Sequence, residues 1–146
     1  MSPPSDIGAG QRPRIEGMTT SEQRKTATRS ALVQGTALAA MGALHFVRPE
    51  HFDALIPASL PGSARAWTLG SGVAELGVAA LLLNRRTRRT GGRAAVALYL
   101  GVWPGNFQMA WDYRNKAPLP KLIAWGRLPL QLPMISPGLH VARHAA

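Results

Sequence analysis

Residues 66–84 read AWTLGSGVAELGVAALLLN, and this stretch of 19 residues contains a single formal charge, that of Glu75. About 17–25 apolar residues are needed to cross a bilayer as a helix. A helix on the surface of a soluble protein would instead carry charged side chains on its solvent face at nearly every turn. The stretch therefore predicts a transmembrane helix with one acidic residue near its middle.

Three further stretches share this character. Residues 30–47, 94–111 and 122–142 are of similar length, and Arg127 is the only formal charge among them. We therefore expect an all-α membrane protein, a four-transmembrane-helix bundle with spans at about 30–47, 66–84, 94–111 and 122–142. The transmembrane domain would cover residues 29–143, followed by a short tail at 144–146.

The first residues of the chain have a different composition. Residues 1–28 are rich in Pro, Gly, Ser, Thr and charged residues, and they contain few large apolar side chains. Because such a segment cannot bury enough apolar surface to fold, a disordered tail is predicted over 1–28. Met18 is an alternative start of translation. A signal peptide cleaved near Ala39 is a less favoured alternative, because its basic region would be unusually long and three spans would remain.

The net charge of +10 is concentrated outside the predicted spans. Basic residues in short loops mark the cytoplasmic side of a membrane protein. The side that holds both chain ends carries the larger set, namely Arg24, Lys25, Arg29, the Arg85–Arg93 stretch and Arg143. Both termini are therefore predicted to be cytoplasmic. The Arg85–Arg93 stretch is predicted to be a loop at anionic headgroups, which we favour over nucleic-acid binding.

The segment between the first two spans contains a second, shorter helix signal. Pro49 suits the first turn of a helix, and Phe52, Leu55 and Ile56 would give that helix an apolar face. A small helix over the outer mouth of the bundle is one interpretation. A loop that only closes the bundle is the other.

Depth along the spans predicts one layer of polar residues. A helix rises about 1.5 Å per residue, so position in a span converts to depth in the membrane. The outer half of the bundle, or its floor, then contains five polar residues from four spans: His45, Glu75, Asn106, Arg127 and Gln131. We predict that they form a polar intramembrane pocket, a candidate ligand-binding site. A purely structural polar core is the alternative.

An unpaired carboxylate inside the membrane costs about 3 kcal/mol, so Glu75 should face a partner in the bundle. Arg127 lies at a suitable depth, and a Glu75–Arg127 ion pair is predicted. Prolines at 104, 129, 133 and 137 remove helical N–H donors from the third and fourth spans. Two broken helices are therefore expected, and their free carbonyl groups would line a cavity that opens outward.

The chain contains no cysteine, which excludes a thiol nucleophile and iron–sulfur ligands. Redox activity would require a bound cofactor or a partner. No metal or haem is expected, because His45 and His140 lie at opposite ends of their spans and His45 with Glu75 makes no ligand set. Catalytic residues are not identifiable, so an enzyme is the less favoured interpretation.

Four strings carry a family resemblance: GALHFVRPEHFDALIP (42–57), SGVAELGVAALLL (71–83), WPGNFQMAW (103–111) and RLPLQLPMI (127–135). Their order and spacing resemble those of the DoxX-like family of small four-helix integral membrane proteins. Members of that family are linked to a thiosulfate:quinone oxidoreductase as its small membrane subunit, and to a membrane complex of oxidative-stress enzymes. The family has no agreed catalytic motif.

The resemblance implies a multi-pass protein of the cell membrane. It would be a non-catalytic membrane subunit or docking partner of a quinone-linked or oxidative-stress redox system, with a soluble oxidoreductase or another membrane subunit as partner. The alternative is a stand-alone binder, carrier or enzyme for a small lipophilic molecule that occupies the polar pocket. A quinone is a possible ligand in either case, and nucleic acid is not an expected partner.

Overall fold

The computed structural model describes residues 18–145, and all regular structure in that range is helical. The helices are α1 (Thr20–Val47), α2 (Pro49–Asp53), α3 (Ala64–Leu83), α4 (Arg88–Asp112) and α5 (Pro118–His144). The all-α class predicted from the sequence is thereby confirmed.

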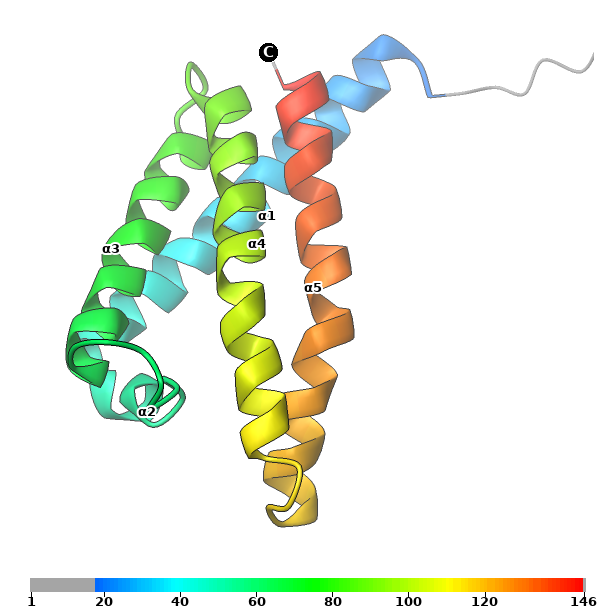
Figure 1. Ribbon diagram of the computed structural model, residues 1–146. Helices are drawn as coiled ribbons and strands as arrows, with labels where there is room; N and C mark the ends of the chain where they lie inside the picture. The colour runs from blue at the N-terminus through cyan, green and yellow to red at the C-terminus, as the bar shows by residue number, and fades with distance from the viewer. Residues whose placement is uncertain (1–17, 146) are drawn as a thin grey trace, which may run out of the picture.

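The four long helices form a ring of antiparallel neighbours. Helix α1 packs against α3, α3 against α4, α4 against α5, and α5 against α1, whereas α3 and α5 do not touch. In Figure 1, α4 and α5 run side by side and α1 crosses behind them at an angle. The first half of α1 therefore contacts α5 and its second half contacts α3.

Helix α1 begins earlier than the sequence suggested. Thr19 and Glu22 form a capping box, in which Glu22 Oε2 accepts from the backbone N–H of Thr19 at 2.7 Å. This reciprocal arrangement satisfies free N–H groups at the helix start. Residues 20–28 are consequently helical, contrary to the predicted disordered tail over 1–28. The rest of that prediction, at residues 1–17, lies outside the described residues, as does Ala146.

Glycines permit the closest approaches between helices. A Cβ on Gly42 in α1 would lie 3.0 Å from the carbonyl oxygen of Gly72 in α3, and one on Gly72 would lie 2.9 Å from the Cβ of His45. Between α4 and α5, a Cβ on Gly92 would lie 2.6 Å from the backbone nitrogen of Ala142. Small residues of this kind let helix backbones pack where no large side chain fits.

Large apolar side chains lie mainly on the outside. Among residues 18–145, the buried ones are Leu38, Val78, Leu82, Tyr99, Met109 and Val141. Alanines make up most of the remaining apolar core. In contrast, 24 large hydrophobic residues are exposed, including Phe107, Trp111, Leu122 and Leu130. An exposed apolar surface this extensive is unusual for a monomer in water.

The prolines do not interrupt the helices, which corrects the prediction of two broken helices. Pro104 lies inside α4, and Pro129, Pro133 and Pro137 lie inside α5. Buried glutamines donate to main-chain oxygens in the same helices: Gln34 Nε2 to Met134 O and Gln131 Nε2 to Tyr99 O, both at 2.7 Å. These bonds connect the two proline-containing helices to their neighbours, α5 to α1 and α4 to α5.

The predicted loop over Arg85–Arg93 is also shorter than expected. Helix α4 begins at Arg88, so only residues 84–87 connect it to α3. Arg88 is 7% exposed, and its Nε donates to the carbonyl oxygen of Leu82 at 3.2 Å, while Thr87 Oγ1 donates to Leu81 O at 2.8 Å. These contacts satisfy free carbonyl groups at the end of α3, and they explain why α4 starts so early.

Two helices, α1 and α3, are long and apolar enough to cross a membrane. The other two long helices are less apolar, because α4 starts with several arginines and α5 contains Lys121, Arg127 and five prolines. The four predicted spans thus coincide with four long helices, of which two have the composition of a membrane span.

The glycine contacts predict opposite effects for one substitution at two positions of α4. Gly92→Ala should lower the free energy of unfolding by about 1–3 kcal/mol, because the new methyl group would overlap the backbone of α5. Gly101→Ala should raise it by about 0.5–1 kcal/mol, because no atom lies near that position and alanine favours the helix. Unfolding in mixed detergent micelles measures both. Equal effects would contradict the close packing at Gly92.

Candidate functional site

The crossing of α1 and α3 brings two predicted site residues together. His45 Nδ1 lies 3.6 Å from Glu75 Oε2, and the side chains are 8% and 16% exposed. The pair occurs beside Gly42 and Gly72, where the two helices are closest. At 3.6 Å the two groups are beyond hydrogen-bonding distance but close enough to interact electrostatically. His45 is thus the polar group that Glu75 meets across the helix interface.

The contacts of His45 define the role of each ring nitrogen. Nδ1 lies 2.8 Å from the carbonyl oxygen of Met41, which can only accept, so Nδ1 must carry the proton that donates to it. The ring stacks on Phe52 of α2, with centroids 3.7 Å apart and planes inclined by 23°. In the neutral ring, Nε2 therefore presents a lone pair. Helix α2 thus packs on the ring, and its presence at Pro49–Asp53 agrees with the small-helix interpretation of this segment rather than with a loop.

Glu75 retains unused hydrogen-bonding capacity. Its Oε2 atom is buried and has no hydrogen-bond partner within residues 18–145, since the His45 nitrogen is beyond bonding distance. A buried oxygen without a donor costs about 1–3 kcal/mol. The site therefore favours a donor from outside the chain, such as water or a ligand group.

The predicted Glu75–Arg127 pair is not formed. Among the described residues the ion pairs are His45–Glu75, His51–Glu50 and Arg65–Asp53. Arg127 is half-buried in α5, and α5 does not contact α3. The two residues thus share a depth but belong to opposite helices of the ring, with His45 as the nearer partner of Glu75.

The other predicted residues lie in a different part of the layer. Gln131 is 3% exposed, and its bond to Tyr99 O connects α5 to α4, while its Oε1 atom is buried without a partner. Asn106 is half-buried, and its side chain makes no hydrogen bond to the described residues. The structure thus joins His45 with Glu75, and it connects neither Asn106 nor Arg127 to this pair.

Two residues of α4 were not singled out from the sequence. The indole Nε1 of Trp103 is buried and has no acceptor within the described chain. Tyr99 is buried one turn earlier, within electrostatic range of Glu75. The signal was present in the sequence, because spacings of four and three residues align Tyr99, Trp103 and Asn106 on one face of a helix. A donor on α4 and an acceptor on α3 are therefore both unused.

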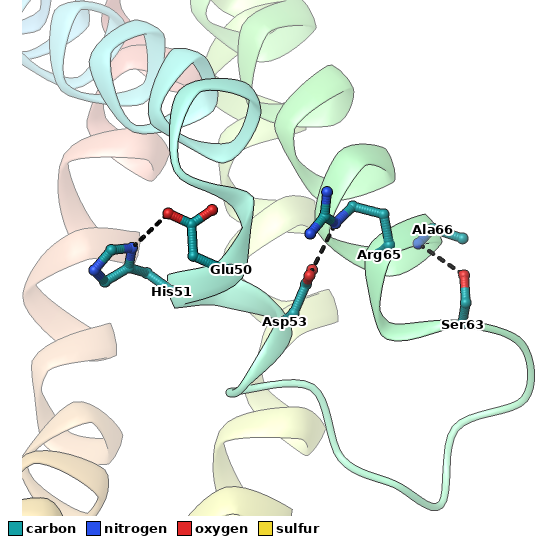
Figure 2. Close-up of polar contacts among 6 residues, drawn as sticks. All are labelled: Glu50, His51, Asp53, Ser63, Arg65 and Ala66. Carbon is teal, nitrogen blue, oxygen red and sulfur yellow. Dashed lines mark hydrogen bonds and ion pairs between the residues drawn. The ribbon is translucent and has the colours of Figure 1, made fainter.

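Helix α2 is attached to α3 beside this site. Arg65 Nε donates to Asp53 Oδ2 at 2.8 Å, and Figure 2 shows this contact next to the Ser63 cap of α3 and the Glu50–His51 pair. The hydroxyl of Thr68 lowers the pKa of Asp53 from its ordinary value, burial opposes that shift, and Arg65 lowers it further. These contacts hold Phe52 against His45.

An open groove of about 520 Å³ lies between α3 and α4. Its α3 wall combines Trp67 with four small residues, and Leu98 forms the α4 wall, while Pro61 lies at one end; the small residues are Ala66, Gly70, Ser71 and Ala74. Glu75 lies one helical turn from Ser71, so the groove is adjacent to the His45–Glu75 pair. A ligand with an apolar part and a polar headgroup could lie in the groove and reach the pair.

The fold and the site define an all-helical protein with a buried His–Glu pair beside an apolar groove. The family model described as Domain of unknown function (DUF8561) matches residues 34–142. The chain therefore belongs to this family. The matched range includes the predicted site residues and most of the four long helices. No curated protein and no solved structure matches the chain.

The His45–Glu75 contact predicts different effects for the two possible cations. His45→Ala should destabilise the bundle by about 1–3 kcal/mol, because it removes the partner of a buried carboxyl group and the contact with Phe52. Arg127→Ala should change stability by less than about 0.5 kcal/mol, because the guanidinium group has no partner in the described chain. Thermal unfolding in detergent measures both. A larger loss of stability for Arg127→Ala than for His45→Ala would indicate that Arg127, and not His45, is the partner of Glu75.

The lowered pKa of Asp53 predicts a pH dependence. A carboxyl group whose pKa is lower in the folded state stabilises the fold above its unfolded pKa, about 4, and this contribution is lost as the pH falls through the folded pKa. Between pH 6 and pH 3 the melting temperature of Asp53→Asn should therefore fall less than that of the wild type. Glu50→Gln, an exposed change in the same helix, should behave like the wild type. An identical pH dependence of the melting temperature in all three proteins would contradict the lowered pKa of Asp53.

Proposed function

We propose that this chain is a multi-pass protein of the cell membrane in which α1, α3, α4 and α5 all cross the bilayer and both termini are cytoplasmic. Three observations support this. The core consists mainly of alanine, whereas 24 large apolar residues face outward in residues 18–145. Two helices already have the composition of a span. Basic residues are concentrated at the end where α1 begins and α5 finishes.

We further propose that the protein binds a small lipophilic molecule that carries a hydrogen-bonding headgroup. The observation that carries this proposal is the presence of two unused buried groups, Glu75 Oε2 and Trp103 Nε1, together with an open apolar groove one helical turn from Glu75. A headgroup with both a donor and an acceptor could satisfy these groups, and a hydrocarbon tail could lie along the small side chains of α3. Ligand sites commonly combine a mostly apolar wall with a few polar groups.

The chemistry of the site favours binding over catalysis. No thiol is present in the chain, and no group of three or more His, Asp or Glu side chains in residues 18–145 could hold a metal ion. Glu75 Oε2 is free to accept a hydrogen bond from a ligand hydroxyl, which suits a headgroup such as that of a reduced quinone. Electrons would have to come from a partner protein.

The second candidate is a membrane subunit of a redox system, and the four strings that resemble DoxX-like proteins support it. The two functions differ in whether the site requires a partner. Stoichiometric recovery with a soluble oxidoreductase from mild detergent would support the subunit. Recovery of the chain alone with a bound lipophile would support the stand-alone binder or carrier.

The membrane topology can be tested directly, because the chain has no native cysteine. Ser59→Cys and Asn115→Cys should react with an impermeant maleimide added to intact cells. Asn84→Cys, at the other end of the bundle, should react only after permeabilisation. Labelling of all three sites in intact cells, or of all three only after lysis, would contradict the proposed arrangement.

Ligand binding can be tested by mass spectrometry of lipophilic molecules extracted from the purified protein. Glu75→Gln and Trp103→Phe should each reduce the retained ligand about tenfold, the effect of losing one buried hydrogen bond. Glu50→Gln and Trp111→Phe make the same chemical changes at exposed positions and should retain it. If no lipophile co-purifies with the wild type, or if all four variants retain it equally, the polar layer is structural only.

A further inference from the structure

A second groove, of about 550 Å³, is a shallow and widely open surface formed by the first half of α1 alone. It is lined by Arg24, Lys25, Thr28, Arg29, Leu32 and Val33. It is separate from the His45–Glu75 pair, because His45 lies in the second half of α1 and Glu75 lies in α3. The groove combines three cations, one hydroxyl group and two aliphatic side chains.

The cations of this groove have no counterion within the described chain. Arg24, Lys25 and Arg29 are exposed and take part in none of the ion pairs formed by residues 18–145. Glu22 is the nearest carboxylate along α1, but its Oε2 already accepts from both the backbone and the hydroxyl of Thr19. The groove therefore has an uncompensated positive charge and is complementary to an anion.

The lining residues change from cationic to aliphatic along the helix axis. With a rise of about 1.5 Å per residue, Val33 lies about 6 Å beyond Arg29 and roughly 13 Å beyond Arg24. Leu32 is 43% exposed and Val33 is 62% exposed, so these two side chains are also available for contact. A phospholipid has the same order, with a charged phosphate followed within a similar distance by its first acyl methylene groups.

We propose that this groove binds an anionic phospholipid of the leaflet at the α1 N-terminal end. The phosphate would contact Arg24, Lys25 and Arg29, the Thr28 hydroxyl would donate to the headgroup, and the acyl chain would lie on Leu32 and Val33. A nucleic acid would also match the charge, but the aliphatic floor offers its bases no aromatic surface on which to stack. The inference rests on the proposed membrane location and is independent of the ligand proposed for the His45–Glu75 site.

Native mass spectrometry of the detergent-solubilised full chain with added phosphatidylglycerol or phosphatidylcholine tests the proposal. The wild type should retain phosphatidylglycerol preferentially. The variant Arg24→Gln/Lys25→Gln/Arg29→Gln should bind it about a hundredfold more weakly, since each cation near an anionic lipid contributes roughly a fivefold factor. The control Arg85→Gln/Arg86→Gln/Arg93→Gln removes the same charge at the same end and should bind nearly as well as the wild type.

The aliphatic part of the groove is tested with Leu32→Ser/Val33→Ser. This variant should bind phosphatidylglycerol more weakly than the wild type, while glycerol phosphate, which lacks acyl chains, should bind neither protein measurably. Equal loss in the two triple variants would overturn the proposal in favour of a diffuse charge effect. Tight binding of glycerol phosphate or of a single-stranded oligonucleotide would overturn it in favour of a free phosphate or a nucleic acid. Labelling of the loop cysteines separates these outcomes from a failure of membrane insertion.

Discussion

The close approach of α1 and α3 at Gly42 and Gly72 is the constraint on which the candidate site depends. A side chain at either glycine would overlap the opposite helix at 2.8–3.0 Å. Because both positions are glycine, the two helices come close enough for the His45 ring to reach Glu75 while its Nδ1 still donates to Met41 O. A carboxyl group in an apolar helix requires a partner of this kind. The glycines thus make it possible to place an acidic residue in the middle of α3.

The ring order of the helices explains the rest of the arrangement. Because α1 contacts both α3 and α5, it supplies His45 to one neighbour and Gln34 to the other. Helix α4 lies between α3 and α5, so it places Trp103 in the interior and accepts the Gln131 amide at Tyr99. Helix α2 completes the site from one end, where Asp53 and Arg65 attach it to α3. The polar contacts of Gln34, His45, Arg65 and Gln131 thereby connect neighbouring helices.

The sequence predicted the number and approximate limits of the long helices, because their apolar stretches are separated by charge and turn residues. It also predicted that Glu75 needs a partner, and it included His45 in the same layer. It did not predict that partner correctly, because depth along a helix says nothing about which helices are neighbours. Arg127 had the right depth and the stronger charge, but α5 lies diagonally opposite α3. The early start of α4 was missed because arginines suggested a loop, whereas Arg88 binds the end of α3.

The arrangement of α1, α3 and α5 can be tested most directly by cross-linking in native membranes, since every cysteine in the protein can be chosen. His45 of α1 and Glu75 of α3 meet at 3.6 Å between Nδ1 and Oε2, whereas α5 does not contact α3. The variant His45→Cys/Glu75→Cys should therefore be joined by a short bifunctional thiol reagent, and Glu75→Cys/Arg127→Cys should not. Cross-linking of the second variant without the first would contradict the helix order on which the site depends.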